Sequence, residues 1–139
     1  MDGALSAYNL RELMIMKRAS EKYILTNQMD WEELGGGVSR KFLGWDNQIM
    51  MVQVKFEKGA EGAPHQHFHT QTTYCASGKF EFQIDGQKQV VEAGDGVYIE
   101  PNLIHGAVCL EEGILIDVFA PVREDFLSGN AVSYFGNKD

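Results

Sequence analysis

From about residue 46 onward, the chain alternates apolar and polar residues in short runs that are separated by glycine. A period of two is typical of strands with one buried face, whereas helices need apolar residues three and four apart. The pattern predicts an all-β domain whose short strands form a sandwich or a barrel. The predicted strands cover residues 48–57, 72–77, 79–84, 87–92, 96–99, 107–111 and 113–119.

Glycine pairs and triplets mark the turns between these runs. Asp85-Gly86 joins two predicted strands, and this dipeptide supplies the positive φ values that a type I′ hairpin requires. The Gly35-Gly36-Gly37 triplet is interpreted as a turn, because a phosphate-binding loop would need a helix after it and the sequence shows none there.

The two ends of the chain are expected to add short helices, over residues 10–18 and 123–127. Residues 1–15 are interpreted as a leader or an added segment, since Met14 and Met16 offer other starts. No linker or repeat divides the rest, so residues 1–139 are predicted to form one domain with its barrel at about 46–120.

Composition and charge argue against some classes of binding partner. The 139 residues include 12 Lys and Arg against 20 Asp and Glu, giving a net charge of -8. This acidity argues against a nucleic-acid partner and, taken alone, disfavours an anionic substrate. No stretch approaches the ~20 apolar residues of a membrane span, and two cysteines show no disulfide framework. We therefore expect a cytoplasmic protein without a membrane partner.

Three of the four histidines alternate in the segment Pro64-His65-Gln66-His67-Phe68-His69-Thr70-Gln71. On an extended strand, His65, His67, His69 and Gln71 would project to one side. Imidazole nitrogens two residues apart suit a divalent transition metal when a third ligand is near. The segment therefore predicts a metal site, and the alternative is a solvated histidine-rich loop.

Asp117 interrupts the apolar run Ile114-Leu115-Ile116-Asp117-Val118-Phe119. In a strand, Asp117 and Phe119 would share one face with Leu115, opposite Ile114. A buried carboxylate is costly unless it is paired or used, so Asp117 is a candidate general acid or base. The alternative is an edge strand on which Asp117 faces solvent.

Arg123 follows Pro121, where the chain must leave this strand. A guanidinium at the mouth of a pocket can hold a carboxylate in bidentate geometry. A surface Arg beside Glu124 and Asp125 would instead form a weak local ion pair. Spacing does not decide between these two interpretations.

Two motifs of this chain resemble those of the cupins. They are Gly59-x5-His65-x-His67-x3-Gln71-x6-Gly78 and Gly94-x5-Glu100-x-Asn102-x2-His105. The resemblance implies a double-stranded β-helix, or jelly roll, that holds one divalent metal ion. By position, it implies the metal ligands His65, His67, Gln71 and His105.

Some positions depart from the usual cupin pattern. Gln71 replaces the common Glu, Glu100 and Asn102 replace Pro and Gly, and Cys109 replaces a frequent Asn. A neutral amide in place of a carboxylate leaves the site more positive, which favours an anionic or electron-rich ligand. Gln71 either ligates the metal or hydrogen-bonds to metal-bound water. His69 is expected beside the site or at its rim.

The segment from Phe56 to Leu127, and above all its tail Asp117-Val118-Phe119-x-Pro121-x-Arg123-x-Asp125-Phe126-Leu127, resembles the pectin-degradation cupins that linearise unsaturated monouronates. The resemblance implies ring opening of a 4,5-unsaturated uronate from pectin or alginate to 5-keto-4-deoxyuronate. It implies that Asp117 moves the proton, Arg123 binds the substrate carboxylate and Phe119 shapes the sugar site.

Two other functions fit the same motifs. One is another cupin enzyme, such as an iron dioxygenase, and the other is a sugar-binding cupin without activity. Histidine and amide ligands do not choose among Zn, Ni, Fe, Mn and Co. A homodimer is expected because cupins commonly pair.

Overall fold

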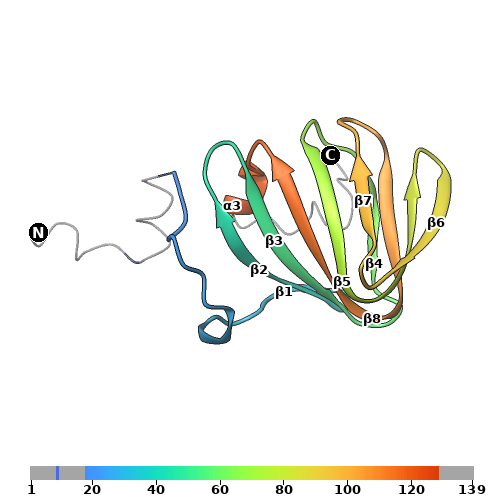
Figure 1. Cartoon of the computed structure of the whole chain (residues 1–139), viewed down its shortest axis with the longest axis horizontal. Helices are drawn as coiled ribbons and strands as arrows, with labels where there is room; N and C mark the ends of the chain where they lie inside the picture. Colours follow the sequence, from blue (N-terminus) through green and yellow to red (C-terminus); the bar gives the residue numbers. More distant parts are fainter. Residues whose placement is uncertain (1–8, 10–17, 129–139) are drawn as a thin grey trace, which may run out of the picture.

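The structure is a computed structural model that describes Asn9 and residues 18–128. Strands make up most of it, as the alternating pattern predicts (Figure 1). In chain order the elements are η1 (Thr26–Gln28), β1 (Glu32–Gly35), β2 (Val38–Trp45), β3 (Met50–Phe56), β4 (Glu61–His65), β5 (Thr70–Ile84), β6 (Gln87–Glu92), β7 (Gly96–Ile99), β8 (His105–Ala120) and α3 (Glu124–Leu127).

Two long antiparallel strands, β5 and β8, organise the sheet. The start of β5 pairs with β7, and its end pairs with β6. The start of β8 pairs with β4, and its end pairs with β3, beyond which lie β2 and β1. Each long strand therefore belongs to both halves of a jelly roll that curves around one interior (Figure 1). The predicted all-β cupin fold is confirmed.

The long strands bend where the sequence pattern predicts breaks. Separate strands were expected on either side of Gly78 and on either side of Glu112, but β5 and β8 run through both points. Gly78 has φ +81°, and a Cβ on Gly113 would collide with the carbonyl oxygen of Ser77. The glycines let two backbones bend together at close range without ending either strand.

The sequence pattern did not predict three of the strands, β1, β2 and β4. In β2, Val38, Ser39 and Arg40 are all buried in succession, so the strand has no alternating pattern. β4 contains Gly62 and Pro64, residues that usually mark turns. Because β1 and β2 join the sheet, it begins at Glu32, earlier than the barrel boundary expected near residue 46.

The two predicted turns are confirmed. Asp85 (φ +50°) and Gly86 (φ +82°) connect β5 to β6, and both values match a type I′ turn. Gly35, Gly36 and Gly37 all have positive φ and lie at the turn between β1 and β2. No helix follows the triplet, because β2 begins at Val38.

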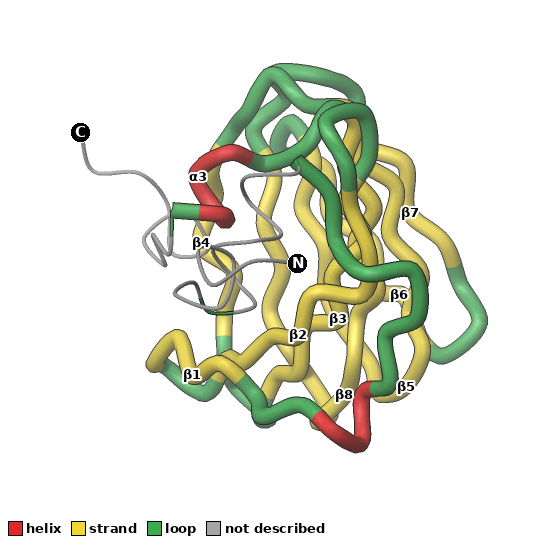
Figure 2. Tube along the Cα trace, turned by 90° about the vertical axis from the view of Figure 1, so that its left-hand side faces the viewer, coloured by secondary structure: helices red, strands yellow, loops and turns green. Residues whose placement is uncertain are grey.

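A single apolar core fills the interior between the curved halves. The predicted C-terminal helix is present as α3, and its Phe126 packs against Phe42 of β2 and Phe119 of β8. Figure 2 shows α3 beside the strands from a second direction. Cys75 and Cys109 are buried and free, as expected of reduced thiols. The fully buried core side chains include Met50, Val52, Val54, Phe80 and Ile99.

The N-terminal helix expected over residues 10–18 falls, apart from Arg18, outside the described residues. So does most of the segment 1–15. Within the described part, the longest helix has four residues, and none has the length and apolar character needed to cross a bilayer.

Candidate active site

Three histidines converge at one end of the interior. His65 ends β4, His67 lies in the connection to β5, and His105 begins β8. Strand pairing places His65 directly opposite His105, and one potential ligand atom from each of the three rings lies within 4.8 Å of the others. This cluster is able to hold a metal ion.

The reason for this convergence differs from the predicted one. β4 ends at His65, so His67 and His69 do not lie on a strand, and the expected one-sided alternation does not hold there. The connection between β4 and β5 is instead held by a hydrogen bond from the loop before β8, in which the backbone N–H of Asn102 donates to the carbonyl oxygen of His67 at 2.8 Å. Asn102 has φ +65°, a conformation that Asn tolerates better than most residues, which suits it to a position where cupins usually have Gly.

Backbone carbonyls orient all three rings. The Nδ1 atoms of His65, His67 and His105 lie 2.8, 3.1 and 2.9 Å from the carbonyl oxygens of Ala63, His69 and Leu103. A carbonyl only accepts, so each Nδ1 carries the ring proton and each Nε2 offers a lone pair. Such partners fix the tautomer of metal-binding histidines.

Burial keeps these rings neutral. Desolvation lowers the pKa of His65 to about 4 and that of His67 to about 3, and it also lowers the pKa of His105. Nε2 of His105 is buried without a hydrogen-bond partner among the described residues. Neutral imidazoles with free lone pairs are the form that binds metal, so the cluster fits a divalent cation.

Gln71, on β5, is also buried beside the histidines. Its Oε1 lies 3.0 Å from Nε2 of His67, and its Nε2 donates to Thr73 Oγ1 at 3.0 Å. In this orientation the amide oxygen and the imidazole lone pair face each other, an arrangement that a cation beside both acceptors would stabilise. This geometry places Gln71 where a fourth ligand would be.

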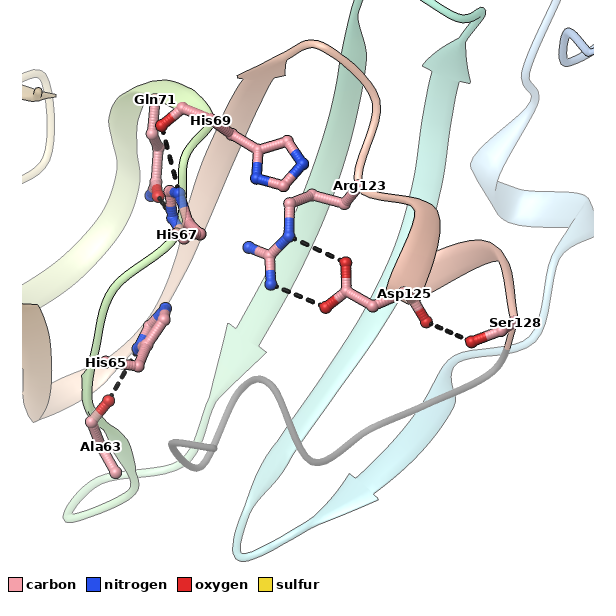
Figure 3. A network of polar contacts seen from close by, with 8 residues as sticks. All are labelled: Ala63, His65, His67, His69, Gln71, Arg123, Asp125 and Ser128. Atoms are coloured by element: carbon pink, nitrogen blue, oxygen red, sulfur yellow. Dashed lines mark hydrogen bonds and ion pairs between the residues drawn. The ribbon is translucent and has the colours of Figure 1, made fainter. Parts of the chain in front are cut away.

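His69 does not join the converging group (Figure 3). Its ring stacks on Phe68 at 3.9 Å between centroids and points toward Arg123. The side chain is buried, and burial lowers its pKa. The structure thus places His69 next to the histidine cluster, on the side of Arg123.

Asp117 and Phe119 point inward, as the strand pattern predicts. Both are buried, while Ile114, Ile116 and Val118 on the other face of β8 are partly exposed. Asp117 accepts a hydrogen bond from Thr73 at 2.7 Å. Burial nevertheless raises the pKa of Asp117 to about 6, with Thr73 and Arg123 opposing the rise. A carboxyl group with a pKa near neutrality is suited to proton transfer.

Arg123 lies buried at the cavity and is paired with Asp125, so it is not the surface residue of the second interpretation. It forms a bidentate ion pair with Asp125, at 3.0 and 2.8 Å, through Nε and Nη2 (Figure 3). It is also buried, and its guanidinium carbon lies 5.0 Å from the ring centroid of Phe119 and 4.2 Å from that of Phe126. Its third nitrogen, Nη1, is not part of the ion pair.

These groups line one cavity that opens to solvent at the end of the jelly roll. Polar and charged residues from the metal cluster and from the Asp117 segment share its wall with apolar rings. Its lining includes His65, Gln71, His105, Asp117, Phe119, Arg123, Phe56, Phe82 and Phe126. The cavity therefore brings together three of the four predicted metal ligands and the predicted catalytic residues, and His67 adjoins it through the histidine cluster.

Sequence reasoning missed Thr73 and left the role of Asp125 open. Thr73 bridges Gln71 and Asp117, and Asp125 holds Arg123. Thr73 was detectable in principle, because Gln71 and Thr73 alternate on the inward face of β5. Asp125 was considered only as the partner of a surface Arg123, whereas the pair that forms at the start of α3 holds a buried guanidinium.

Comparison with known proteins agrees with the fold. The cupin domain family matches residues 52–119. The pectin degradation protein KdgF of Dickeya dadantii is 47% identical over 108 residues, which cover 76% of this chain and 98% of that protein. The chain is a cupin of the KdgF family.

Two solved structures of other proteins are similar to this KdgF-family cupin. An RmlC-like cupin from Shewanella frigidimarina is 44% identical with a TM-score of 0.77, over 78% of this chain and 98% of that one. KdgF from a Halomonas species is 36% identical with a TM-score of 0.74, over 77% and 99%. The family shares the jelly roll that surrounds the cavity described above.

Proposed function

We propose that the protein is an isomerase-type enzyme that opens the ring of 4,5-unsaturated monouronates and yields the linear 5-keto-4-deoxyuronate. The observation that carries the proposal is the shared cavity, in which the histidine cluster, a carboxyl group of raised pKa and a buried guanidinium face one space. The relationship to KdgF, a pectin degradation protein, supports a sugar acid as the substrate.

The reaction rearranges bonds without adding or removing atoms. The hydroxyl on C1 loses its proton, the bond between C1 and the ring oxygen breaks, and C1 becomes an aldehyde. The ring oxygen remains on C5 as an enol or enolate. Protonation of C4 then converts this enol into the C5 ketone. The site must therefore move one proton and hold the sugar by its carboxylate.

His65, His67, His105 and Gln71 would hold one divalent metal ion, which supplies a Lewis acid for substrate oxygens when bound. The protein's own contribution is the neutral charge of these four groups. Because none of them neutralises the ion, the cavity keeps a net positive charge toward an anionic substrate. The metal is Zn, Ni, Fe, Mn or Co in this proposal.

Asp117 is the proposed proton carrier. Its carboxylate takes the proton from the C1 hydroxyl, and the resulting carboxyl group protonates C4. A pKa of about 6 allows both transfers near neutral pH, because neither the acid nor the base form is strongly favoured.

Arg123 and Phe119 would orient the sugar. Asp125 fixes the guanidinium plane, so that Nη1 can donate to the substrate carboxylate without losing the pair. The ring centroid of Phe119 lies 5.0 Å from the guanidinium carbon of Arg123 and 5.7 Å from the ring centroid of His67. Phe119 would therefore form an apolar wall between the carboxylate-binding Arg123 and the histidine cluster.

The proposal is tested by mixing the protein with a lyase-generated unsaturated monouronate and following the ultraviolet absorbance of the C4–C5 double bond. We expect loss of absorbance above the spontaneous rate, its suppression by a chelator and its recovery when metal is restored. Binding without loss of absorbance would favour a sugar-binding cupin. Oxygen uptake by an iron-loaded sample would favour a dioxygenase.

A further inference from the structure

A chain of polar contacts links the histidine cluster to Asp117. Nε2 of His67 lies 3.0 Å from Oε1 of Gln71, Nε2 of Gln71 lies 3.0 Å from Oγ1 of Thr73, and this oxygen lies 2.7 Å from Oδ1 of Asp117. Thr73 is 2% exposed, and Gln71 and Asp117 are 6% and 7% exposed. Water has little access to these three side chains, so the hydroxyl of Thr73 and the two groups beside it depend on one another for their hydrogen bonds.

The number of protons determines the direction of this chain. The hydroxyl of Thr73 has one proton, and an ionised carboxylate only accepts. Thr73 must therefore donate to Asp117, and it can only accept from Gln71. This requires the amide NH₂ of Gln71 to face Thr73 and its carbonyl oxygen to face His67, where a cation would be bound.

With Asp117 protonated, the same chain can run in reverse. The carboxyl group can then donate to Thr73, the hydroxyl can donate to the carbonyl oxygen of Gln71, and the amide NH₂ can turn toward His67. An NH₂ group has no lone pair for a metal. The charge of Asp117 and the identity of the Gln71 atom that faces the cluster are thus connected through one hydroxyl group.

We propose that Thr73 is a positioning residue that holds the amide oxygen of Gln71 toward the metal cluster and the carboxylate of Asp117 toward the cavity. The assignment of Asp117 to proton transfer rests on the proposed function, whereas the effect on metal binding does not. Thr73 is not among the residues that line the cavity, so it acts through its two neighbours.

The test compares Thr73→Val, which removes the hydroxyl at nearly constant shape, with Thr73→Ser, which keeps it. Affinity for Zn²⁺ is measured by competition with a chromogenic chelator. We expect a loss of about tenfold or more in Thr73→Val, the range seen when the partner of a metal ligand is removed, and near wild-type affinity in Thr73→Ser. Thr72→Val, which removes an exposed hydroxyl one position away on β5, is the matched control and should bind Zn²⁺ normally.

A second comparison separates positioning from general damage. In a Gln71→Ala background, Thr73→Val should cause no further loss of Zn²⁺ affinity, because its effect passes through the amide. Thr73→Val leaves the buried Asp117 carboxylate without its hydrogen-bond donor and could fail to fold for that reason. In that case the double variant Thr73→Val/Asp117→Asn, which removes this buried charge, should show the same loss of Zn²⁺ affinity.

A pH profile of turnover gives a further readout. The groups that face Asp117 are Thr73 on β5, Arg123 after β8 and the histidine cluster across the cavity. The hydrogen bond from Thr73 favours the ionised form of Asp117. Thr73→Val should therefore move the limb of the pH profile that reports on Asp117 to higher pH, and Thr73→Ser should not.

Equal Zn²⁺ affinity in Thr73→Val and wild type would overturn the proposal. So would equal losses in Thr73→Val and Thr73→Ser, or additive losses in the double variant. If the expected Zn²⁺ pattern appears and no uronate is converted, the role of Thr73 stands and the proposed substrate fails.

Discussion

At the scale of single residues, Asp117 shows how a carboxylate is kept in an apolar jelly roll. Its position on β8 turns it toward the interior, where burial raises its pKa to about 6. One hydrogen bond from Thr73 and the charge of Arg123 only partly offset this burial. A side chain held at such a cost, beside a group of lone pairs able to hold a metal, is more consistent with a working acid or base than with a structural role.

Replacement of Asp117 by Asn should therefore abolish turnover and leave the metal in place. We expect a fall of about 10² to 10⁴ in kcat, the usual range for a lost general acid or base. Metal content, measured by atomic emission after dialysis, should equal that of wild type, because the Asn carbonyl oxygen can still accept the hydrogen bond from Thr73 and so keeps the direction of the chain of polar contacts. Glu112→Gln, an exposed carboxylate on the same strand, is the control. Loss of metal in Asp117→Asn would instead give Asp117 a structural role at the cluster.

The raised pKa of Asp117 also predicts a pH dependence of stability in metal-free protein. The folded state holds a proton up to about pH 6, whereas the unfolded chain releases it near 3.8. The free energy of unfolding should therefore fall as pH rises between these values and lose about 3 kcal/mol from this group, at 1.36 kcal/mol per pKa unit.

Urea unfolding of wild type and Asp117→Asn at pH 4 and pH 7 measures this contribution, since other groups cancel in the difference. On going from pH 4 to pH 7, the free energy of unfolding of the variant should rise relative to that of wild type. A pH-independent difference would mean that the Asp117 pKa is ordinary in the folded state.

Arg123 predicts a separate effect on substrate handling. Arg123→Lys keeps a positive charge but cannot keep both the bidentate pair with Asp125 and a bond to substrate. We expect KM for the uronate to rise about tenfold or more with a smaller change in kcat, as measured by steady-state kinetics. An unchanged KM would show that the substrate carboxylate binds elsewhere.

At the scale of elements, the sequence predicted what local residues determine and missed what distant contacts determine. The turn at Asp85-Gly86 and strands β6 and β7 follow from local alternation and turn chemistry. The continuity of β5 and β8 does not, because the glycine positions that look like breaks are bends at which two backbones touch. The histidines of the cluster were predictable by motif, but the register that sets His65 against His105 appears only in the fold.

The bend at Gly78 predicts a large and local stability effect. A Cβ there would lie 2.5 Å from the carbonyl oxygen of Glu112, in addition to the strain of φ +81°. Gly94 has φ +99° but open space around it. In urea unfolding, Gly78→Ala should cost about 2 kcal/mol or more beyond Gly94→Ala. Equal costs would show that the bend can relax.

At the scale of the whole molecule, a net charge of -8 coexists with a cavity that suits an anion. Within the cavity, four neutral groups would surround a dication, and Arg123 lies beside them. Local charge decides what binds in a partly enclosed cavity, whereas the total charge mainly affects solubility and the rate of encounter. The acidity of the chain therefore does not exclude a uronate.

The homodimer expected from the cupin resemblance stays a prediction at this scale. Light scattering during size-exclusion chromatography should give twice the 15.6 kDa of one chain at micromolar concentration. A mass of one chain that does not change as the protein concentration is raised would contradict it.

Proton delivery to C4 of an opened uronate is the central claim, and proton NMR in D₂O tests it most directly. Wild type loaded with metal should convert an unsaturated monouronate faster than the spontaneous rate and place one deuterium at C4 in a single stereochemical position at early times. Asp117→Asn with equal metal content should lack both effects. Conversion no faster than the spontaneous rate, or deuterium distributed equally between both C4 positions, would contradict the account.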